Sequence, residues 1–400
     1  MRNISKKLGL LFVALTFVFS AGVQTADAGA KIKFGKNSSL RINYREQLYA
    51  VWRDTGSGPD KKDPTTDLYF KRNRFTFSGK ATKTTGFVLQ VEHKGPRAIG
   101  DLEVFEDKTS ALAVLDAFMT FKFSRALRLR VGLTKDPLTR ENNEGCFDTL
   151  NLDRGLFIYN PFQPSRDLGI VAWGRTANKL FQYRVGIMEG RDGGNSPKSS
   201  LRYTGRVHVT LLDRVESASL IYRGSFIGKK KVLTFGAGAQ YEPDVVYANL
   251  SAQTGAKDNW NYTFDGFFEY PTPAGVFTLS GAYLAVSFDD AYKGGDPDPA
   301  GLDFYKERKG WYVKAGYMIP TPYVEKVQLF GRFENWKYAQ LRGINDQSLN
   351  WASFGVNYLI RGQNLRLTLE YALTDYDKEL SGPKASEDFT TITTMLQFLF

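Results

Sequence analysis

Basic side chains occupy alternate positions in several stretches of this chain. In LRLRVGL, which begins at Leu127, Arg128 and Arg130 alternate with apolar residues. This period of two is that of a β-strand, whose successive side chains point to opposite faces. The planar guanidinium of arginine offers a fork of donors that fits an oxyanion. The stretch therefore predicts a strand with one apolar face and one face able to bind anions.

The same alternation assigns further bases to the polar face of other predicted strands. Arg72 and Arg74, for example, lie on the face opposite Phe75. The acids assigned to the polar face are fewer than the bases: Glu92, Asp116, Asp265, Glu269, Glu334 and Glu370. Some bases are expected to pair with these acids or, at the rim, with lipopolysaccharide phosphates, but a positive surplus remains. A channel lined by one sign of charge concentrates the opposite ion, and rings of Arg and Lys select anions.

The elements that would position these bases are strands. Sixteen stretches show the strand period, near residues 39–53, 66–82, 84–95, 110–124, 126–134, 166–177, 179–189, 200–212, 231–243, 258–271, 275–289, 308–320, 325–339, 348–361, 363–377 and 388–400. Short connections alternate with long polar ones, like the periplasmic turns and outer loops of single-chain bacterial barrels, whose strand number is even. The sequence predicts an all-β, 16-stranded antiparallel transmembrane β-barrel over residues 31–400.

Two further features bear on the membrane assignment. Aromatics make up 14% of the chain, and Tyr49, Tyr69, Trp52, Trp173, Trp260, Trp311, Trp336 and Trp351 fall toward predicted strand ends. Interfacial girdles of membrane barrels place Trp and Tyr at that level. Residues 213–230 fit less well, because they fall where a short turn is expected. They form either an extra hairpin, which would raise the count to eighteen strands, or a small periplasmic excursion.

The two ends of the chain indicate export to a membrane. Arg2, Lys6 and Lys7 precede an apolar run and small-residue cleavage patterns, so residues 1–30 are predicted to be a secretory signal peptide rather than a retained anchor. The chain ends in an amphipathic strand with a terminal Phe400, which looks like the assembly signal of outer-membrane barrels. The single cysteine allows neither a disulfide within the chain nor a C-x-x-C-H haem site.

The longest connection, residues 135–165, follows the fifth predicted strand. A loop of this length in a compact protein is usually functional or disordered, and its apolar content argues against disorder. We expect it to fold into the lumen as a constriction; the alternative is a cap outside the barrel. The candidate anion pathway comprises Arg72, Arg74, Lys122, Arg128, Arg130, Lys135, Arg140, Arg154, Arg184, Arg202, Arg206, Arg332 and Arg366.

Four local patterns resemble the phosphate-selective porin O/P family. They are KRNRFTFSGKAT at 71–82, VGLTKDPLTRE at 131–141, RDLG at 166–169 and GRFE at 331–334. The first is similar to the family's second strand, and the others resemble its G-x-x-K-x-P-x-x-x-E, R-D-x-G and A-R-Y-E motifs. The resemblance implies a trimeric sixteen-stranded anion channel, in which Arg72, Arg74, Lys135 and Arg332 take the positions of the family's bases.

These observations predict an anion-selective porin of the bacterial outer membrane, for passive diffusion of phosphate-like or other small oxyanions. Expected partners are small inorganic anions, outer-membrane lipid and lipopolysaccharide, and two further copies in a homotrimer; no cofactor, metal or nucleic acid is expected. The main alternative is a barrel sheath for an outer-membrane cytochrome complex. A barrel enzyme is disfavoured because the only histidines, His93 and His208, sit in no recognisable Ser/Asp constellation. A soluble β protein is the remaining alternative.

Overall fold

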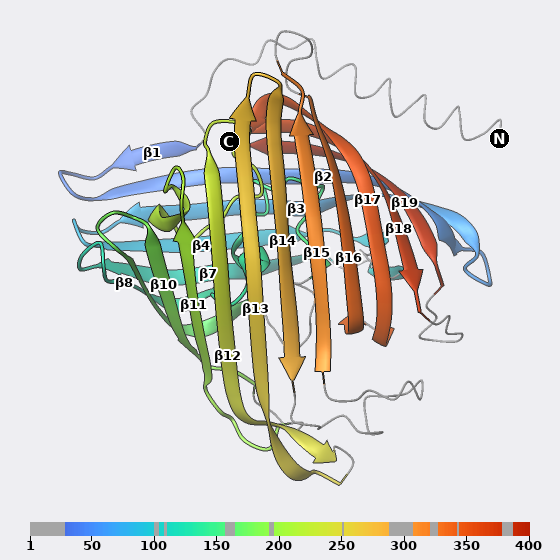
Figure 1. The fold of residues 1–400 in the computed structure, drawn as a ribbon, viewed down its shortest axis with the longest axis horizontal. Helices are drawn as coiled ribbons and strands as arrows, with labels where there is room; N and C mark the ends of the chain where they lie inside the picture. Colours follow the sequence, from blue (N-terminus) through green and yellow to red (C-terminus); the bar gives the residue numbers. More distant parts are fainter. Residues whose placement is uncertain are drawn as a thin grey trace.

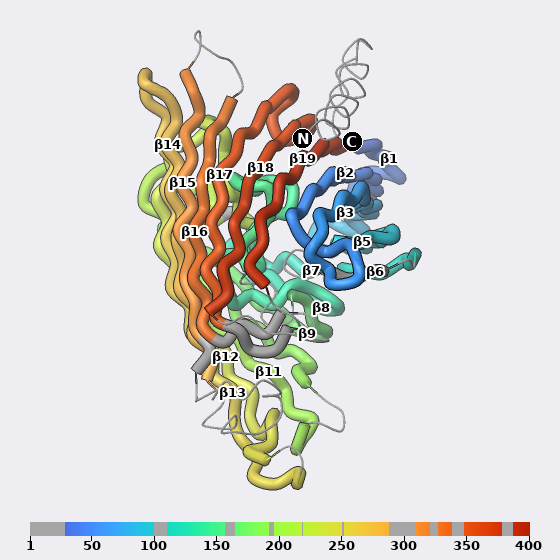
Figure 2. Tube along the Cα trace, turned by 90° about the vertical axis from the view of Figure 1, so that its right-hand side faces the viewer, coloured from blue at the N-terminus to red at the C-terminus, as the bar shows by residue number. Residues whose placement is uncertain are grey.

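The predicted barrel is present in the computed structural model of the chain. The structure describes residues 29–99, 104–107, 110–156, 165–191, 196–249, 252–287, 307–320, 327–341, 344–377 and 387–400. Within these residues, sixteen antiparallel strands close into a ring in which β19 pairs with β2 and β9 with β10. Figures 1 and 2 show β12 to β18 as one curved wall that faces β2, β3, β4 and β7 across the interior.

The strands of the ring correspond one for one to the predicted stretches. They are β2 (Ser39–Ser57), β3 (Asp63–Lys80), β4 (Thr85–Lys94), β7 (Ala111–Lys122), β8 (Arg128–Lys135), β9 (Arg166–Arg175), β10 (Phe181–Met188), β11 (Arg202–Thr210), β12 (Val232–Asn249), β13 (Thr254–Thr272), β14 (Gly275–Ser287), β15 (Glu307–Met318), β16 (Val327–Leu341), β17 (Ile344–Gln363), β18 (Leu365–Tyr376) and β19 (Phe389–Leu399).

Few other elements accompany the ring. β1 (Ala30–Lys33) pairs with the start of β2, and β5 (Arg97–Ile99) pairs with β6 (Val104–Asp107). The helical turns are α2 (Arg140–Asn143) and η3 (Glu216–Ala218). None of the helices in the described part of the chain has the length and apolar character needed to cross a membrane. Of the predicted signal peptide, residues 1–28 lie outside the described residues.

The two faces of the wall differ as the strand period predicts. On β13, Trp260, Tyr262 and Phe264 point outward and are 38%, 43% and 60% exposed, whereas Asn261 and Thr263 between them are fully buried inside. An exposed apolar belt around a polar interior is the arrangement of a barrel whose outer face meets lipid.

Two expectations from the sequence are corrected here. Residues 213–230 add no strand to the ring, so the barrel has no eighteen-strand form; the segment turns back inside instead and forms a bridge between Tyr222 and Glu144. Most of the proposed aromatic girdle is also wrong, because Tyr49, Tyr69, Trp173, Trp336 and Trp351 are buried on the inner face. The alternation that assigns Arg332 and Glu334 to the lumen assigns Trp336 to it as well.

Candidate functional site

The described part of the connection between β8 and β9, the predicted constriction loop, contacts the inner face of the barrel. Directly after β8, α2 begins with Thr139 as its N-cap, whose hydroxyl accepts a hydrogen bond from the Asn142 backbone N–H at 3.0 Å. Inward side chains of five strands, β2 and β16 to β19, donate to carbonyls of the loop that follows. Gln47 of β2 donates to the Cys146 carbonyl at 3.2 Å and Asn357 of β17 to the Leu150 carbonyl at 2.8 Å.

Two arginines of the predicted pathway complete this attachment. Arg366 of β18 donates to the Thr149 carbonyl at 2.7 Å, and Arg332 of β16 donates to the Asp153 carbonyl at 2.9 Å. These strands are neighbours on one side of the ring. On the opposite side, Arg206 of β11 donates to the Leu138 carbonyl at 3.2 Å, so the described part of the loop is bonded to both sides.

Many of the predicted bases form buried ion pairs. Arg72 lies 2.8 Å from Asp153, Arg74 2.5 Å from Glu92, Arg140 2.7 Å from Glu216, Arg206 2.7 Å from Asp265, and Arg332 3.0 Å from Glu334; Arg202 lies 2.5 Å from Asp167 and 3.2 Å from Glu242. These guanidiniums are at most 7% exposed. Paired in this way, they hold the loop and the wall together, and their charge is largely offset.

A second group of bases has no acidic partner within the described residues. It comprises Lys122, Arg128, Arg130 and Arg184. Lys122 is directly opposite Arg128, Arg128 is opposite Trp173, Trp173 is opposite Arg184, and Arg184 is opposite Arg206. The pairing therefore aligns Lys122, Arg128 and Arg184 across β7 to β10, and Arg130 lies two residues along β8 from Arg128; these four bases are called the row.

Aromatic rings support two members of this row. The Arg128 guanidinium lies 4.6 Å from the Trp173 ring centre, and that of Arg130 lies 4.7 Å from the Phe118 ring centre. Lys122 is exposed and both arginines are partly exposed. Like charges aligned across strands repel one another, so the row gains stability from any anion that approaches it.

The remaining predicted bases fasten the loop to itself. Lys135 donates from Nζ to the carbonyls of Asn142, at 2.7 Å, and Glu144, at 3.0 Å. Arg154 donates to the same Asn142 carbonyl at 3.3 Å. Both side chains thus face loop backbone at the constriction.

The loop carries carboxyl and thiol groups with altered acidity. Burial raises the pKa of Asp136 to about 6 and that of Glu144 to about 7. Burial would also raise the pKa of Asp153, but Arg72, Lys71 and Arg154 together hold it below its usual range. Burial would likewise raise the pKa of the Cys146 thiol, yet the positive charges of Arg154, Arg72 and Arg74 bring that pKa well below its usual value.

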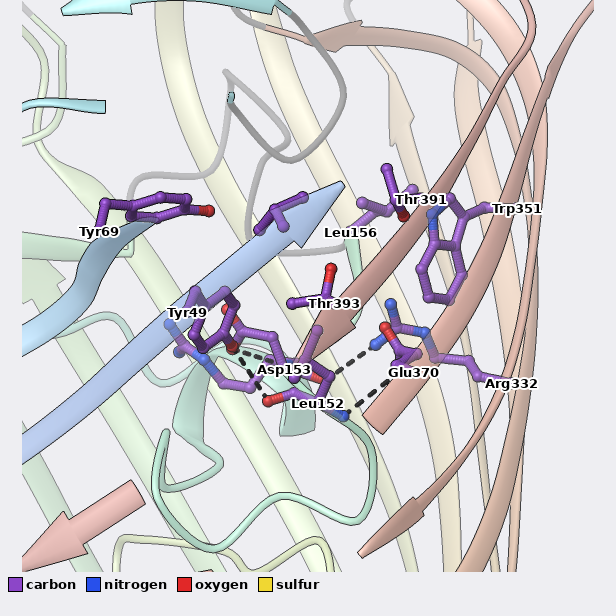
Figure 3. A pocket seen from close by; sticks show the side chains of 12 residues that line it. Tyr49, Tyr69, Leu152, Asp153, Leu156, Arg332, Trp351, Glu370, Thr391 and Thr393 are labelled. Atoms are coloured by element: carbon purple, nitrogen blue, oxygen red, sulfur yellow. Dashed lines mark hydrogen bonds between the residues drawn. The ribbon is translucent and has the colours of Figure 1, made fainter. Parts of the chain in front are cut away.

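One cavity of about 60 Å³ opens beside the loop (Figure 3). Tyr49, Tyr69 and Trp351 line it together with Asp153, Glu370 and Arg332, among other residues. The cavity is thus small, and both signs of charge line it.

The sequence analysis missed three kinds of residue in this interior. The acids Glu141 and Asp153 of the loop, and Glu216 between β11 and β12, lie outside strands, where alternation assigns no face. Tyr222 contacts three arginines from a segment that was expected to form an extra hairpin or a periplasmic excursion. Trp173 and Phe118 occupy inward-facing positions of their strands. This alternation was the sequence signal for their ring contacts with Arg128 and Arg130.

Comparison with known proteins relates this architecture to outer-membrane channels. Residues 50–400 match the family described as "Phosphate-selective porin O and P". An uncharacterized protein of Aquifex aeolicus (strain VF5) is 24% identical, over 98% of this chain and 95% of that protein. The anion-selective porin from Comamonas acidovorans is 10% identical with a TM-score of 0.57, over 91% of this chain and 100% of that one. The trimer form of OmpT, an outer membrane protein of Vibrio cholerae, is 11% identical with a TM-score of 0.53, over the same shares.

Proposed function

Because this chain belongs to the phosphate-selective porin O and P family, we propose that it is an anion-selective porin through which small oxyanions, phosphate-like ones among them, diffuse passively. The family and the fold are those of a bacterial outer-membrane porin, a channel rather than an enzyme. The observation that carries the anion preference is the row of bases without acidic partners, Lys122, Arg128, Arg130 and Arg184. The Comamonas acidovorans porin of similar fold is named as anion-selective, which supports the proposal.

The preference for anions follows from the different surroundings of the acidic and basic side chains in the lumen. Acids such as Asp153, Glu216 and Asp265 are neutralised in buried ion pairs, so they add little negative potential to the water-filled part of the lumen. Lys122, Arg128 and Arg130, which are exposed or partly exposed, keep their charge near water, between low-dielectric walls that focus the field. An entering anion is attracted and a cation repelled.

Charge reversal on the row tests the proposal. In a planar bilayer with a KCl gradient, Arg128→Glu/Arg130→Glu should shift the reversal potential toward cation preference. Lys83→Glu/Lys179→Glu changes the charge equally on exposed turns and should leave the potential near that of the wild type. If both double variants behave alike, charge in the row does not set selectivity and the proposal fails.

We also propose a homotrimer, supported by the trimer form of OmpT from Vibrio cholerae, whose fold is similar. Light scattering on the detergent-purified protein, corrected for bound detergent, should give three times the mass of one mature chain. A monomer mass that persists after mild extraction would contradict this assembly.

A further inference from the structure

Residues 211–231, here called the inner segment, form a second body inside the barrel. The segment leaves β11 and returns to β12, but between them it contacts the constriction loop. The Tyr222 backbone N–H donates to the Asn143 carbonyl at 3.1 Å, and the Gly145 N–H donates to the Tyr222 carbonyl at 3.0 Å. The Glu269 carboxylate of β13 accepts from the N–H groups of Phe226 and Gly228 at 2.9 Å each. The inner segment is therefore bonded both to the loop and to the wall.

Glu216 of the inner segment binds Arg140 of the loop through two hydrogen bonds. Arg140 Nη2 lies 2.7 Å from Glu216 Oε1, and Arg140 Nη1 lies 3.0 Å from Oε2. Both residues are at most 2% exposed. This paired geometry is the one in which a guanidinium binds a free carboxylate or phosphate. Here the bound carboxylate is tethered to a segment that does not belong to the barrel wall.

Tyr222 of the same segment covers the neighbouring arginines. Its ring centre lies 4.7 Å from the Arg140 guanidinium, 4.2 Å from that of Arg184 and 5.2 Å from that of Arg206. Its hydroxyl accepts from Arg206 Nε at 3.0 Å and lies 2.8 Å from Nδ1 of His208. An aromatic ring between guanidiniums reduces their mutual repulsion and keeps them from water.

Arg184 is the member of this group whose donors are incompletely used. It donates from Nε to Gln182 at 2.8 Å and from Nη1 to the Leu220 carbonyl at 3.1 Å. Its Nη2 is buried and has no hydrogen-bond partner in the part of the chain that the structure describes. If the inner segment moved away, Arg140 and Arg184 would lose both the Glu216 charge and the Tyr222 ring. Arg206 would keep Asp265, so the uncovered group would carry surplus positive charge.

We propose that the inner segment is an autoinhibitory plug and that Glu216 occupies, as a tethered carboxylate, an oxyanion-binding site made by Arg140, Arg184 and Arg206. The inference rests on the proposed function, because the ligand that displaces Glu216 is a small oxyanion travelling through the lumen. Displacement moves Tyr222 out of the arginine group and opens the half of the interior bounded by β10 to β14. The same oxyanion would therefore open the channel and be transported through it.

Neutralising Glu216 tests the plug directly. In single-channel recordings in KCl, Glu216→Gln should raise conductance, because the tether loses its charge. Inorganic phosphate should raise the wild-type conductance by displacing Glu216, and the same opening should need at least about tenfold less phosphate in Glu216→Gln, a difference that corresponds to about 1.4 kcal/mol of binding. Lys229→Gln, an exposed change on the same segment, is the matched control and should behave as the wild type. Unchanged conductance and phosphate response in Glu216→Gln would overturn the proposal.

A cross-link provides a test that keeps Glu216 and Arg140 intact. The Oγ1 of Thr210 on β11 and the Oγ of Ser217 lie 3.3 Å apart, so cysteines there should be within reach of a disulfide. In a Cys146→Ser background, oxidised Thr210→Cys/Ser217→Cys should stay in a low-conductance state when phosphate is added, and dithiothreitol should restore the response. Identical behaviour before and after reduction would overturn the plug. A cation-selective wild type would instead refute the proposed function, so the two failures are distinguishable.

Discussion

At the scale of single residues, the interior bases differ in what balances their charge. Arg72, Arg202 and Arg206 are bonded to buried acids, and their main effect is to fix the loop and the wall. Arg128 and Arg130 lie on aromatic rings and form no ion pair within the described residues. The same residue type on the same strand face therefore serves two purposes, and the partner decides which one.

This difference predicts opposite effects of removing two arginines. Arg206→Ala leaves Asp265 as an uncompensated buried charge, which typically costs ~3–5 kcal/mol of folding free energy. Arg130→Ala breaks no ion pair, because the nearby Asp116 keeps its bond to Arg166, and it relieves repulsion from the row, so its cost should be far smaller. Reversible urea unfolding in lipid or detergent measures both. Equal losses of stability would show that the ion pair with Asp265 is not what makes Arg206 structural.

Strand period predicts which bases point inward, but it does not reveal their partners. Arg72 and Arg184 both follow directly from alternation. That Asp153 neutralises Arg72, and that Arg184 has a buried Nη2 without a hydrogen-bond partner among the described residues, depends on where non-periodic segments fold. Long-range contacts between a loop and a wall leave no local pattern in the sequence, so the sequence alone could not separate structural bases from free ones.

At the scale of elements, all sixteen strands were predicted because each has to present an apolar face to lipid and a polar face to the lumen. The inward course of residues 213–230 was not predicted. Because these residues do not face lipid, nothing imposes an alternation of apolar and polar residues on them. The inward aromatics were misassigned for a related reason: Trp336 belongs to the lumen by parity, but aromatics near strand ends are also what an interfacial girdle requires.

The stability of the packed loop should depend on pH because of the buried carboxyl group of Glu144. Burial raises the pKa of Glu144 from 4.5 to about 7, so between these values the unfolded chain has lost a proton that the packed loop retains. Packing is therefore fully favoured below the lower value and weakens as pH rises through the higher one. The positive charges of Lys314, Arg140 and Arg154 lower the pKa of Glu144 and so reduce this pH dependence. The negative charge of Glu141 raises that pKa and so increases it.

Hydrogen–deuterium exchange of peptides from residues 136–156, corrected for intrinsic rates, measures this effect. Protection in the wild type should be greater at pH 6 than at pH 8. Glu144→Gln removes the titrating group and should flatten the dependence over that interval, although Asp136, whose pKa is raised to about 6, still contributes below it. An equally steep dependence in the Gln variant would assign the effect to another group.

At the scale of the whole molecule, the barrel encloses its own chain. The constriction loop and the inner segment meet inside, and each is bonded to the wall. In the described residues this leaves little interior space for a second protein, so the sheath alternative finds no support in the packing. The outer face, by contrast, is apolar around the ring and suits contact with lipid and with further copies of the chain.

The central claim is that the free bases of the lumen make this porin prefer anions. The most direct measurement is the reversal potential of the wild-type protein in a planar bilayer that separates two KCl concentrations. A potential of the sign carried by chloride is expected, because Lys122, Arg128 and Arg130 hold unneutralised positive charge near water. A potential of the sign carried by potassium would contradict the account and would mean that acids, rather than these bases, govern the open path.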